Sequence, residues 1–547
     1  MRTVQVSPSF FTGSSGEPLF QRVRPRIPAI TLAAGLLLAG CAAQEADGIT
    51  PISGFAGVVA GDEPRAVVVG RDIIGLGGTA VDAAIAMYFT MAVTLPSRAS
   101  LGGGGVCVTF DGNRKQGGTI EFLPRAASSG GVVPSGMRAM AVLHARYGTL
   151  RWEQLLTPAE TLARFGHAVS RAFSQDLAAE SDRIAANPEL MRLFSARSGR
   201  LARTGDRIIQ SELSAVLGGI RQQGAGYLYS GAFARRLAEA STAVGMPLSV
   251  EDVRNTLPKI TEAVAVPAGN DVAFFAPPRA TGGVVAAQIW EALTEVESFG
   301  GADDARLHAF AEASARAFSQ RAAWMAPDGS SREPVPDLVA ESRIKAMMAG
   351  YSDARHTPTN TLSPPPREIS SGSPSAGFVI GDRYGNAIAC TLTMNRAFGA
   401  GRVAEGTGIL LAAPPRSPND GSNVLTAVVV GNVRAGTMRF AGTAAGGAQG
   451  VTALARVMLE LNRKEPLETA VVAQRVHHGG APDVLLVEPG IDAGTRAGLR
   501  NRGYTLREAP DLGRVNAFYC ARGLRGSQEE CTVKTDPRGS GLASMAQ

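Results

Sequence analysis

The sequence has none of the short motifs that mark the commonest metal-dependent and nucleophilic enzymes. It contains no HExxH, no CxxC, no P-loop and no GxSxG pattern. Only six histidines occur, and none has the spacing of a metal-ligand cluster. His477 and His478 are adjacent, which on a helix would point their rings about 100° apart. We therefore expect neither a metal nor a cofactor.

Lysine and aromatic residues are also scarce. The net charge of +6 comes mostly from arginine, with only five lysines and no run of basic residues. This distribution argues against a nucleic-acid partner. Aromatic residues make up 6% of a chain that is 45% hydrophobic, so we expect a core built mainly from Ala, Val, Leu and Ile.

No apolar run is long enough to span a membrane, but the N-terminus has the pattern of an export signal. Three arginines precede an apolar stretch over residues 27–38, and small residues then lead to Cys41. This ending resembles a bacterial lipobox, in which the thiol is acylated. We expect residues 1–41 to be a lipoprotein signal peptide and Cys41 to attach the exported protein to a membrane of the bacterial cell envelope, on the periplasmic side. An ordinary signal peptide with an incidental cysteine is the alternative.

Export makes disulfides possible among the four remaining cysteines. Cys520 and Cys531 are close in sequence and flank a loop rich in Gly and Arg, so we expect them to form a disulfide that staples a hairpin. Cys107 and Cys390 lie in apolar alternating stretches, and we expect them to be buried, unpaired thiols.

The chain divides around one polar segment. Residues 136–325 have mainly helical periodicity, whereas residues 351–374 have no apolar period and are rich in Pro and Ser, which predicts an exposed connector. Alternation on both sides of residues 382–386 then predicts a β-hairpin. A second hairpin is predicted where the glycines at 102–105 lead into a strand and a turn at 111–113.

Ser375 lies directly after the connector and directly before the predicted strand. If the bond between Pro374 and Ser375 is cut, Ser375 gains an α-amino group with an ordinary pKa of about 7.7 to 8.0, suitable for a general base. Nucleophile and base then share one residue and no histidine is needed. Ser373, two residues upstream, is the competing candidate.

Several segments resemble the gamma-glutamyltransferase family, in that family's order over roughly residues 54–540: GGTAVDAAIA, LGGGGVCVTFDG, HARYGTLRWEQLLTPA, RATGGVVAAQIWEAL, GDRYGNAIACTLTMNRAFGAG, GTAAGGAQGVTAL and KTDPRGSG. The resemblance implies an α/β fold, the four-layer αββα sandwich of N-terminal-nucleophile hydrolases. It also implies self-cleavage into a large chain, residues 42–374, and a small chain, residues 375–547, which stay associated. The implied substrate is a small γ-glutamyl or related amide.

Aligned without a gap in the hairpin, the family's nucleophile falls on Ser375. Thr393 then matches the residue that hydrogen-bonds the nucleophile, and Asn395 one that contacts the amino-acid head of the donor. Gly446 and Gly447 match the pair whose N–H groups form the oxyanion hole. A tight turn at a helix start would explain the same glycines.

The positions expected to hold the substrate's charged head depart from the family. Its carboxylate-binding Arg falls on Leu123, with Arg125 two positions later, and the pair that holds the α-amino group falls on Pro414 and Ser417. A serine pair becomes Gly421 and Ser422, which leaves Arg125, Asn395 and Ser422 as the expected substrate contacts. We therefore expect acyl transfer or amide hydrolysis with altered substrate choice. The alternative is a non-catalytic, lipid-anchored member with a decayed pocket.

Overall fold

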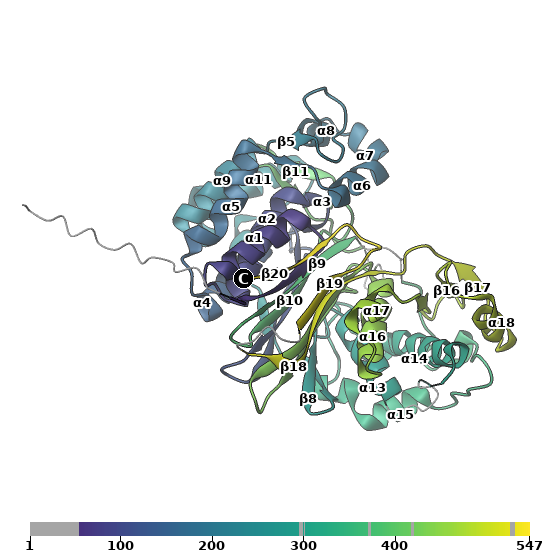
Figure 1. Ribbon diagram of the computed structural model, residues 1–547. Helices are drawn as coiled ribbons and strands as arrows, with labels where there is room; N and C mark the ends of the chain where they lie inside the picture. Colours follow the sequence, from purple (N-terminus) through teal and green to yellow (C-terminus); the bar gives the residue numbers. More distant parts are fainter. Residues whose placement is uncertain (1–53, 295–298, 300, 370–373, 417–420, 526–530) are drawn as a thin grey trace, which may run out of the picture. The chain divides into compact units, whose positions relative to one another are not determined.

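Alternating apolar residues build two facing β-sheets in the computed structural model, which describes residues 54–547 apart from 295–298, 300, 370–373, 417–420 and 526–530 (Figure 1). The first sheet has the order β20-β1-β9-β10-β2-β3-β6, and neighbouring strands are antiparallel. Its strands are β1 (Gly57–Gly61), β2 (Gly104–Asp111), β3 (Gln116–Phe122), β6 (Lys259–Thr261), β9 (Ser375–Asp382), β10 (Ala387–Thr393) and β20 (Leu542–Ala546). Both predicted hairpins, β2–β3 and β9–β10, are confirmed.

The second sheet has the order β19-β18-β14-β13-β8-β7 and is also antiparallel. Its strands are β7 (Val264–Ala268), β8 (Asp271–Phe275), β13 (Thr426–Asn432), β14 (Thr437–Ala445), β18 (Arg514–Leu524) and β19 (Cys531–Thr535). Short strand pairs outside the two sheets are β4 (His167–Ala168) with β5 (Arg207–Ile208), β11 (Arg402–Ala404) with β12 (Ile409–Leu411), and the set β15 (Val476–His477), β16 (Leu485–Val487) and β17 (Leu506–Glu508).

Helices cover the outer face of each sheet, which gives the four layers expected from the resemblance (Figure 1). On the side of the first sheet lie α1 (Pro64–Gly75), α2 (Ala80–Thr94), α4 (Gly136–Tyr147), α5 (Trp152–Phe165), α9 (Ser211–Gln223) and α11 (Gly231–Ala243). On the side of the second lie α13 (Gly282–Thr294), α14 (Asp303–Trp324), α15 (Glu341–Met348), α16 (Ala448–Asn462), α17 (Leu467–Val472) and α18 (Ala493–Asn501). The αββα fold class is confirmed.

Shorter helices complete the chain: α3 (Pro96–Ala99), α6 (Arg171–Ala179), α7 (Ser181–Ala185), α8 (Pro188–Phe194), α10 (Gly226–Tyr229), α12 (Val250–Asn255), and the 3-10 turns at Val335–Val339 and Thr359–Thr361. Every residue of α2 is buried, because the helix lies between the first sheet and α5. Thr79 and Asp82 form a reciprocal capping box that starts it. Among the described helices, none combines the length and apolar character needed to cross a membrane.

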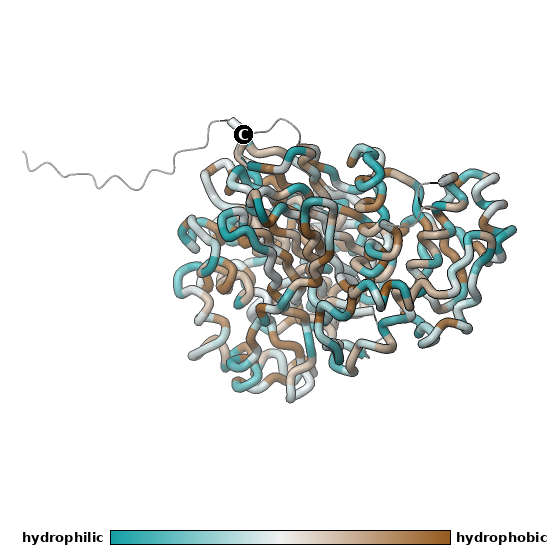
Figure 2. Tube along the Cα trace, turned by 90° about the horizontal axis from the view of Figure 1, so that it is seen from below, coloured by the Kyte–Doolittle hydropathy of each residue, from teal (hydrophilic) through white to brown (hydrophobic). Residues whose placement is uncertain are grey.

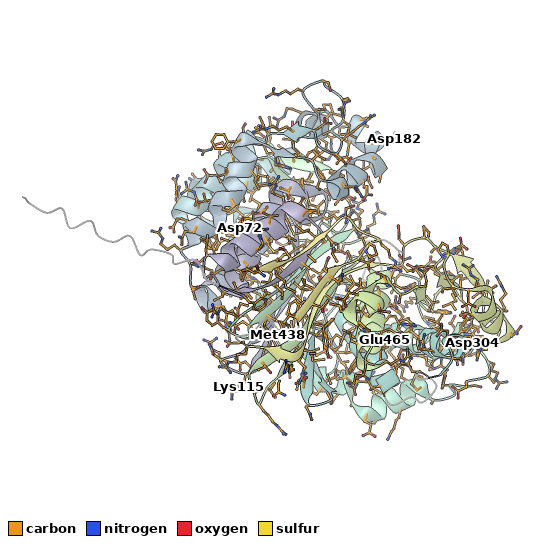
Figure 3. All side chains as sticks on the ribbon, in the orientation of Figure 1. Asp72, Lys115, Asp182, Asp304, Met438 and Glu465 are labelled. Atoms are coloured by element: carbon orange, nitrogen blue, oxygen red, sulfur yellow. A yellow bond between two sulfur atoms is a disulfide. The ribbon has the colours of Figure 1, made fainter. Side chains whose placement is uncertain are left out.

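Apolar side chains from both sheets fill the space between them, and hydrophobic segments concentrate in the interior in Figure 2. Gly377 on β9 permits a close approach, because a Cβ there would lie 2.6 Å from the Thr443 side chain on β14. At one end the turns of the two sheets meet, where Lys115 Nζ donates to the Arg434 carbonyl at 2.8 Å (Lys115 and the core residue Met438 are labelled in Figure 3).

The expectation that Cys107 and Cys390 are unpaired thiols is wrong. The two residues lie directly opposite each other on β2 and β10 and form a disulfide, with a Cα–Cα distance of 4.1 Å. Alternation in each strand indicates burial but does not indicate which strands become neighbours across 283 residues. Cys520 and Cys531 form the second disulfide, between β18 and β19.

The connector at 351–374 crosses the surface, and of its described residues only Thr359 and Ile369 are buried. Ser373 lies outside the described residues, as do Ser417 and the whole targeting segment with Cys41. The predicted lipidation and the competition between Ser373 and Ser375 therefore stay predictions.

Candidate active site

Ser375 is the first residue of β9, in the middle of the first sheet, and only 1% of its surface is exposed. Thr393, at the end of β10, is its direct partner in the strand register. Ser375 and Thr393 therefore lie side by side at the ends of two neighbouring strands.

The second sheet presents two glycines to the same place. Strand β14 ends at Ala445, and Gly446 and Gly447 follow with φ angles of +114° and +58°, just before the first turn of α16. The Gly446 N–H donates to Ser375 Oγ at 3.4 Å. Positive φ favours glycine here, and the Gly446 N–H points toward the hydroxyl at the positive end of a helix dipole. This arrangement suits an oxyanion hole.

Thr393 contacts the residue that precedes Ser375. Its hydroxyl donates to the Pro374 carbonyl at 3.3 Å and accepts the Asn395 N–H at 2.9 Å. In the uncleaved chain the carbonyl of Pro374 is the group that Ser375 would attack. A donor on that oxygen makes the carbon more electrophilic.

Asn395 is held by backbone groups from two other segments. Its Nδ2 donates to the Pro124 carbonyl at 2.9 Å and to the Ala413 carbonyl at 2.7 Å. Its φ of +62° is rare for a residue other than glycine and is fixed by these contacts. The Asn395 amide therefore joins the segments of Pro124 and Ala413 beside Thr393.

Two residues that hold the strand of Ser375 in place were not found from the sequence. Asp62 Oδ2 accepts the Gly377 N–H at 2.7 Å, and the Asp62 N–H donates to the Gly377 carbonyl at 3.0 Å. Asn516 Nδ2 donates to Asp62 Oδ1 at 3.1 Å. Together they fix β9 two residues after Ser375. No local pattern marks Asp62, because its partner is 315 residues away.

The residues at the positions expected to bind a charged substrate head are buried or contact other protein groups. Leu123 is buried among the apolar side chains between the two sheets. Arg125 Nη1 donates to the Asp328 carbonyl, and Nη2 lies 3.9 Å from Glu121 Oε1. Ser422 is buried, and Pro414 is partly buried.

Burial dominates the electrostatics of this part of the site. It raises the pKa of Glu121, although Arg125 and Arg279 oppose the shift, and it lowers the pKa of Arg125. Glu121 and the two arginines lie 3.8 to 3.9 Å apart, too far for hydrogen bonds. The cluster is thus a loosely paired set of charges near the Asn395 side of the site.

One group of side chains has the composition of a metal site: His356, His478 and Asp483. The hydrogen bonds argue against ligation. His356 directs Nδ1 at Glu312 Oε1 (2.7 Å) and Nε2 at Asp483 Oδ1 (2.9 Å), so both ring nitrogens face carboxylates. Nδ1 of His478 accepts the Gly480 N–H, which leaves its proton on Nε2, facing Asp483.

This group is better described as an ion-pair network that holds the connector. Burial lowers the pKa of His356, but the carboxylates of Glu312 and Asp483 outweigh it and raise the pKa overall. For Glu312, burial raises the pKa, but His356 and Arg316 outweigh it and lower the value to about 2. Thr359 N also donates to Asp483 Oδ2 at 3.0 Å, so the network joins the connector to the C-terminal region.

Comparisons with known proteins agree with the geometry. The family described as gamma-glutamyltranspeptidase matches residues 66–414 and 422–546. The chain is 26% identical to a "Glutathione hydrolase proenzyme" of Escherichia coli, covering 90% of this chain and 92% of that protein. It is 25% identical to an "Acylase ACY 1 proenzyme" of a Pseudomonas species, covering 86% and 90%. A solved cephalosporin acylase from Bacillus halodurans shares the fold with a TM-score of 0.74, 19% identity and coverage of 90% and 96%.

Proposed function

The chain belongs to the gamma-glutamyltranspeptidase family, and from that premise we propose that it is an amide hydrolase or acyltransferase that cleaves itself before Ser375. One observation carries the proposal: Ser375 Oγ accepts the Gly446 N–H at 3.4 Å while Thr393 donates to the adjoining Pro374 carbonyl at 3.3 Å.

Self-cleavage begins when Ser375 Oγ attacks the carbonyl carbon of Pro374. The C–N bond breaks, an ester forms between the two residues, and water hydrolyses it. The products are a carboxylate on Pro374 and a Ser375 with a free hydroxyl and a free α-amine.

In the mature enzyme the α-amine takes the proton of Ser375 Oγ as the oxygen attacks an amide carbonyl. Gly446 and Gly447 N–H groups stabilise the oxyanion, and one such donor typically contributes about 3 to 4 kcal/mol. The amine leaves with the proton, and water or an acceptor amine then releases the acyl group from Ser375.

The substrate we propose is an amide with a γ-glutamyl or related acyl group, in which the α-amino group is weakly recognised. Leu123 and Pro414 offer no charge to a zwitterionic head, and the nearby Arg125 already contacts the Asp328 carbonyl. Similarity to both glutathione hydrolases and acylases is compatible with this choice.

We also propose that the protein is exported and held on the periplasmic side of the envelope by lipid on Cys41. The sequence of residues 27–41 is its support. Labelled fatty acid should enter the wild-type protein and be absent from Cys41→Ala, and equal labelling of both would remove the proposal.

The experiment that tests the catalytic proposal uses the purified mature protein. On a denaturing gel run with reductant, two bands are expected, and N-terminal sequencing of the smaller should begin at Ser375. A start at Ser373 would move the nucleophile. A wild-type protein that folds and stays uncut would instead favour the non-catalytic alternative, to which the burial of Leu123 in the apolar core lends some support.

A further inference from the structure

A cavity of about 280 Å³ lies beside the reacting groups, lined among others by Pro374, Gly446, Arg98, Asp176 and Arg514. Its lining contains none of the positions expected to hold the acyl head of the substrate. The cavity therefore offers space to a second part of a substrate bonded to the same carbonyl carbon.

Most charges around the cavity are already paired. Arg98 donates Nε and Nη2 to the two oxygens of Asp176 at 2.8 and 2.6 Å, and Ser97 Oγ donates to the same carboxylate at 2.6 Å. Glu180 forms an ion pair with Arg183 at 3.0 Å. These groups satisfy one another and have little to offer a ligand.

Arg514 differs from them. It is the first residue of β18 and pairs in register with Ala445, so it stands next to the oxyanion glycine Gly446. Its Nε is buried without a hydrogen-bond partner, and within the described part of the chain no carboxylate forms an ion pair with it. The side-chain stem packs against Gly539, where a Cβ would lie 3.0 Å from Cδ.

Keeping this guanidinium unpaired is energetically unfavourable. Burial lowers its pKa and Arg98 lowers it further, whereas Asp62, Asp176 and Asp511 oppose the shift only in part, although the last two line the same cavity. Arg514 is partly buried, and a cation held there without a paired carboxylate costs free energy that an anionic ligand would recover. The planar fork of arginine matches a carboxylate. The alternative is a structural role, in which Arg514 only balances the negative charge of Asp62 and Asp176.

We propose that Arg514 binds a carboxylate on the leaving amine of the substrate, which makes this cavity the leaving-group and acceptor subsite. The inference rests on the proposed amide chemistry at Ser375. It assigns the leaving side because the positions expected to hold the acyl head do not line this cavity.

The test compares two substrates that share an acyl group, a glutaryl para-nitroanilide and its analogue with a carboxylate on the ring. Wild type, Arg514→Gln, Arg514→Lys and Arg507→Gln are assayed, where Arg507 is an exposed arginine on β17 and serves as the matched control. Arg514→Gln should lower kcat/KM for the carboxylated substrate by about tenfold to a hundredfold and leave the uncharged one within about twofold. Arg514→Lys should recover part of the loss, and Arg507→Gln should change neither.

An equal loss on both substrates would overturn the subsite in favour of charge balance. A second measurement does not depend on turnover: binding of the products, amino-nitrobenzoate and para-nitroaniline, to the self-cleaved protein. Selective binding of the benzoate that Arg514→Gln removes supports the subsite even if neither anilide is hydrolysed, in which case only the proposed acyl specificity fails. Equal, unselective binding in wild type and Arg514→Gln would overturn it.

Discussion

The two sides of the candidate site differ in the groups that form them: one relies on backbone groups and the other on side chains. On the proposed attacking side, Gly446 donates its backbone N–H to Ser375, and contacts between Asp62 and the Gly377 backbone fix the strand that begins at Ser375. On the proposed recognition side, we expect specificity to depend on side chains at Leu123 and Arg125, where the sequence is expected to depart from the family.

This difference indicates that the reacting groups and the substrate-recognition groups of an enzyme can diverge independently. A backbone donor needs only the right φ, which glycine supplies, and a well-fixed strand, so we expect such an attack geometry to tolerate extensive sequence change. A charged substrate head needs charged side chains in place, and replacing one changes the substrate rather than the reaction. Variants on each side of the site test this difference, and the largest expected effect comes first.

Ser375→Ala should abolish both self-cleavage and amidase activity, a loss of about four orders of magnitude or more, because one hydroxyl performs both attacks. Ser375→Thr keeps a hydroxyl and should still cleave. Band patterns with reductant and initial rates measure both. Cleavage that persists in Ser375→Ala would place the nucleophile elsewhere.

Gly446→Ala should lower kcat by about a hundredfold to a thousandfold while the protein still folds. A Cβ there would lie 3.2 Å from Gly513 Cα and would strain a φ of +114°, which turns the N–H away from Ser375 Oγ. Steady-state kinetics measures the loss and circular dichroism checks the fold. Gly199→Ala is the matched control, since it also has positive φ (+79°) but has open space around it. Unchanged kcat in Gly446→Ala would show that this peptide is no oxyanion donor.

Glutathione should be a poor substrate compared with glutaryl amides. A γ-glutamyl and a glutaryl para-nitroanilide differ only in the α-ammonium group, and we expect the glutaryl compound to have a kcat/KM about tenfold to a hundredfold higher. An ammonium group left without a partner in a partly dry pocket is costly, by several kcal/mol at most. If glutathione and the γ-glutamyl compound turn over as efficiently as the glutaryl one, the recognition side has not diverged.

The smallest effect concerns Glu121. Because burial raises its pKa above the ordinary 4.5, the folded protein holds this proton more tightly than the unfolded chain does. The stabilisation is therefore full at pH values below 4.5 and is lost as the pH rises through the folded pKa. Relative to Glu121→Gln, the wild type should lose stability as the pH rises above 4.5. Urea unfolding at several pH values measures this, and a constant difference would contradict it.

The sequence predicted the four layers, both hairpins and the place of Ser375, because these depend on local alternation, turn residues and the order of recognisable segments. It could not predict Asp62, Asn516 or the pairing of Cys107 with Cys390, because each depends on which distant strands become neighbours. Arg514 was missed for the same reason. Its position next to Gly446 depends on its pairing with Ala445, which lies on another strand.

The disulfide between β2 and β10 has a consequence for the mature protein. Cys107 precedes the proposed cut at Ser375 and Cys390 follows it, whereas Cys520 and Cys531 both follow it. Cleavage would thus turn an internal loop bridge into a covalent link between two polypeptides. Their association would no longer be a bimolecular equilibrium that dilution can reverse, because each chain experiences the other at a fixed effective concentration. In an oxidising compartment the two chains would stay joined at any protein concentration. The affinity between them could be measured only after the disulfide is reduced.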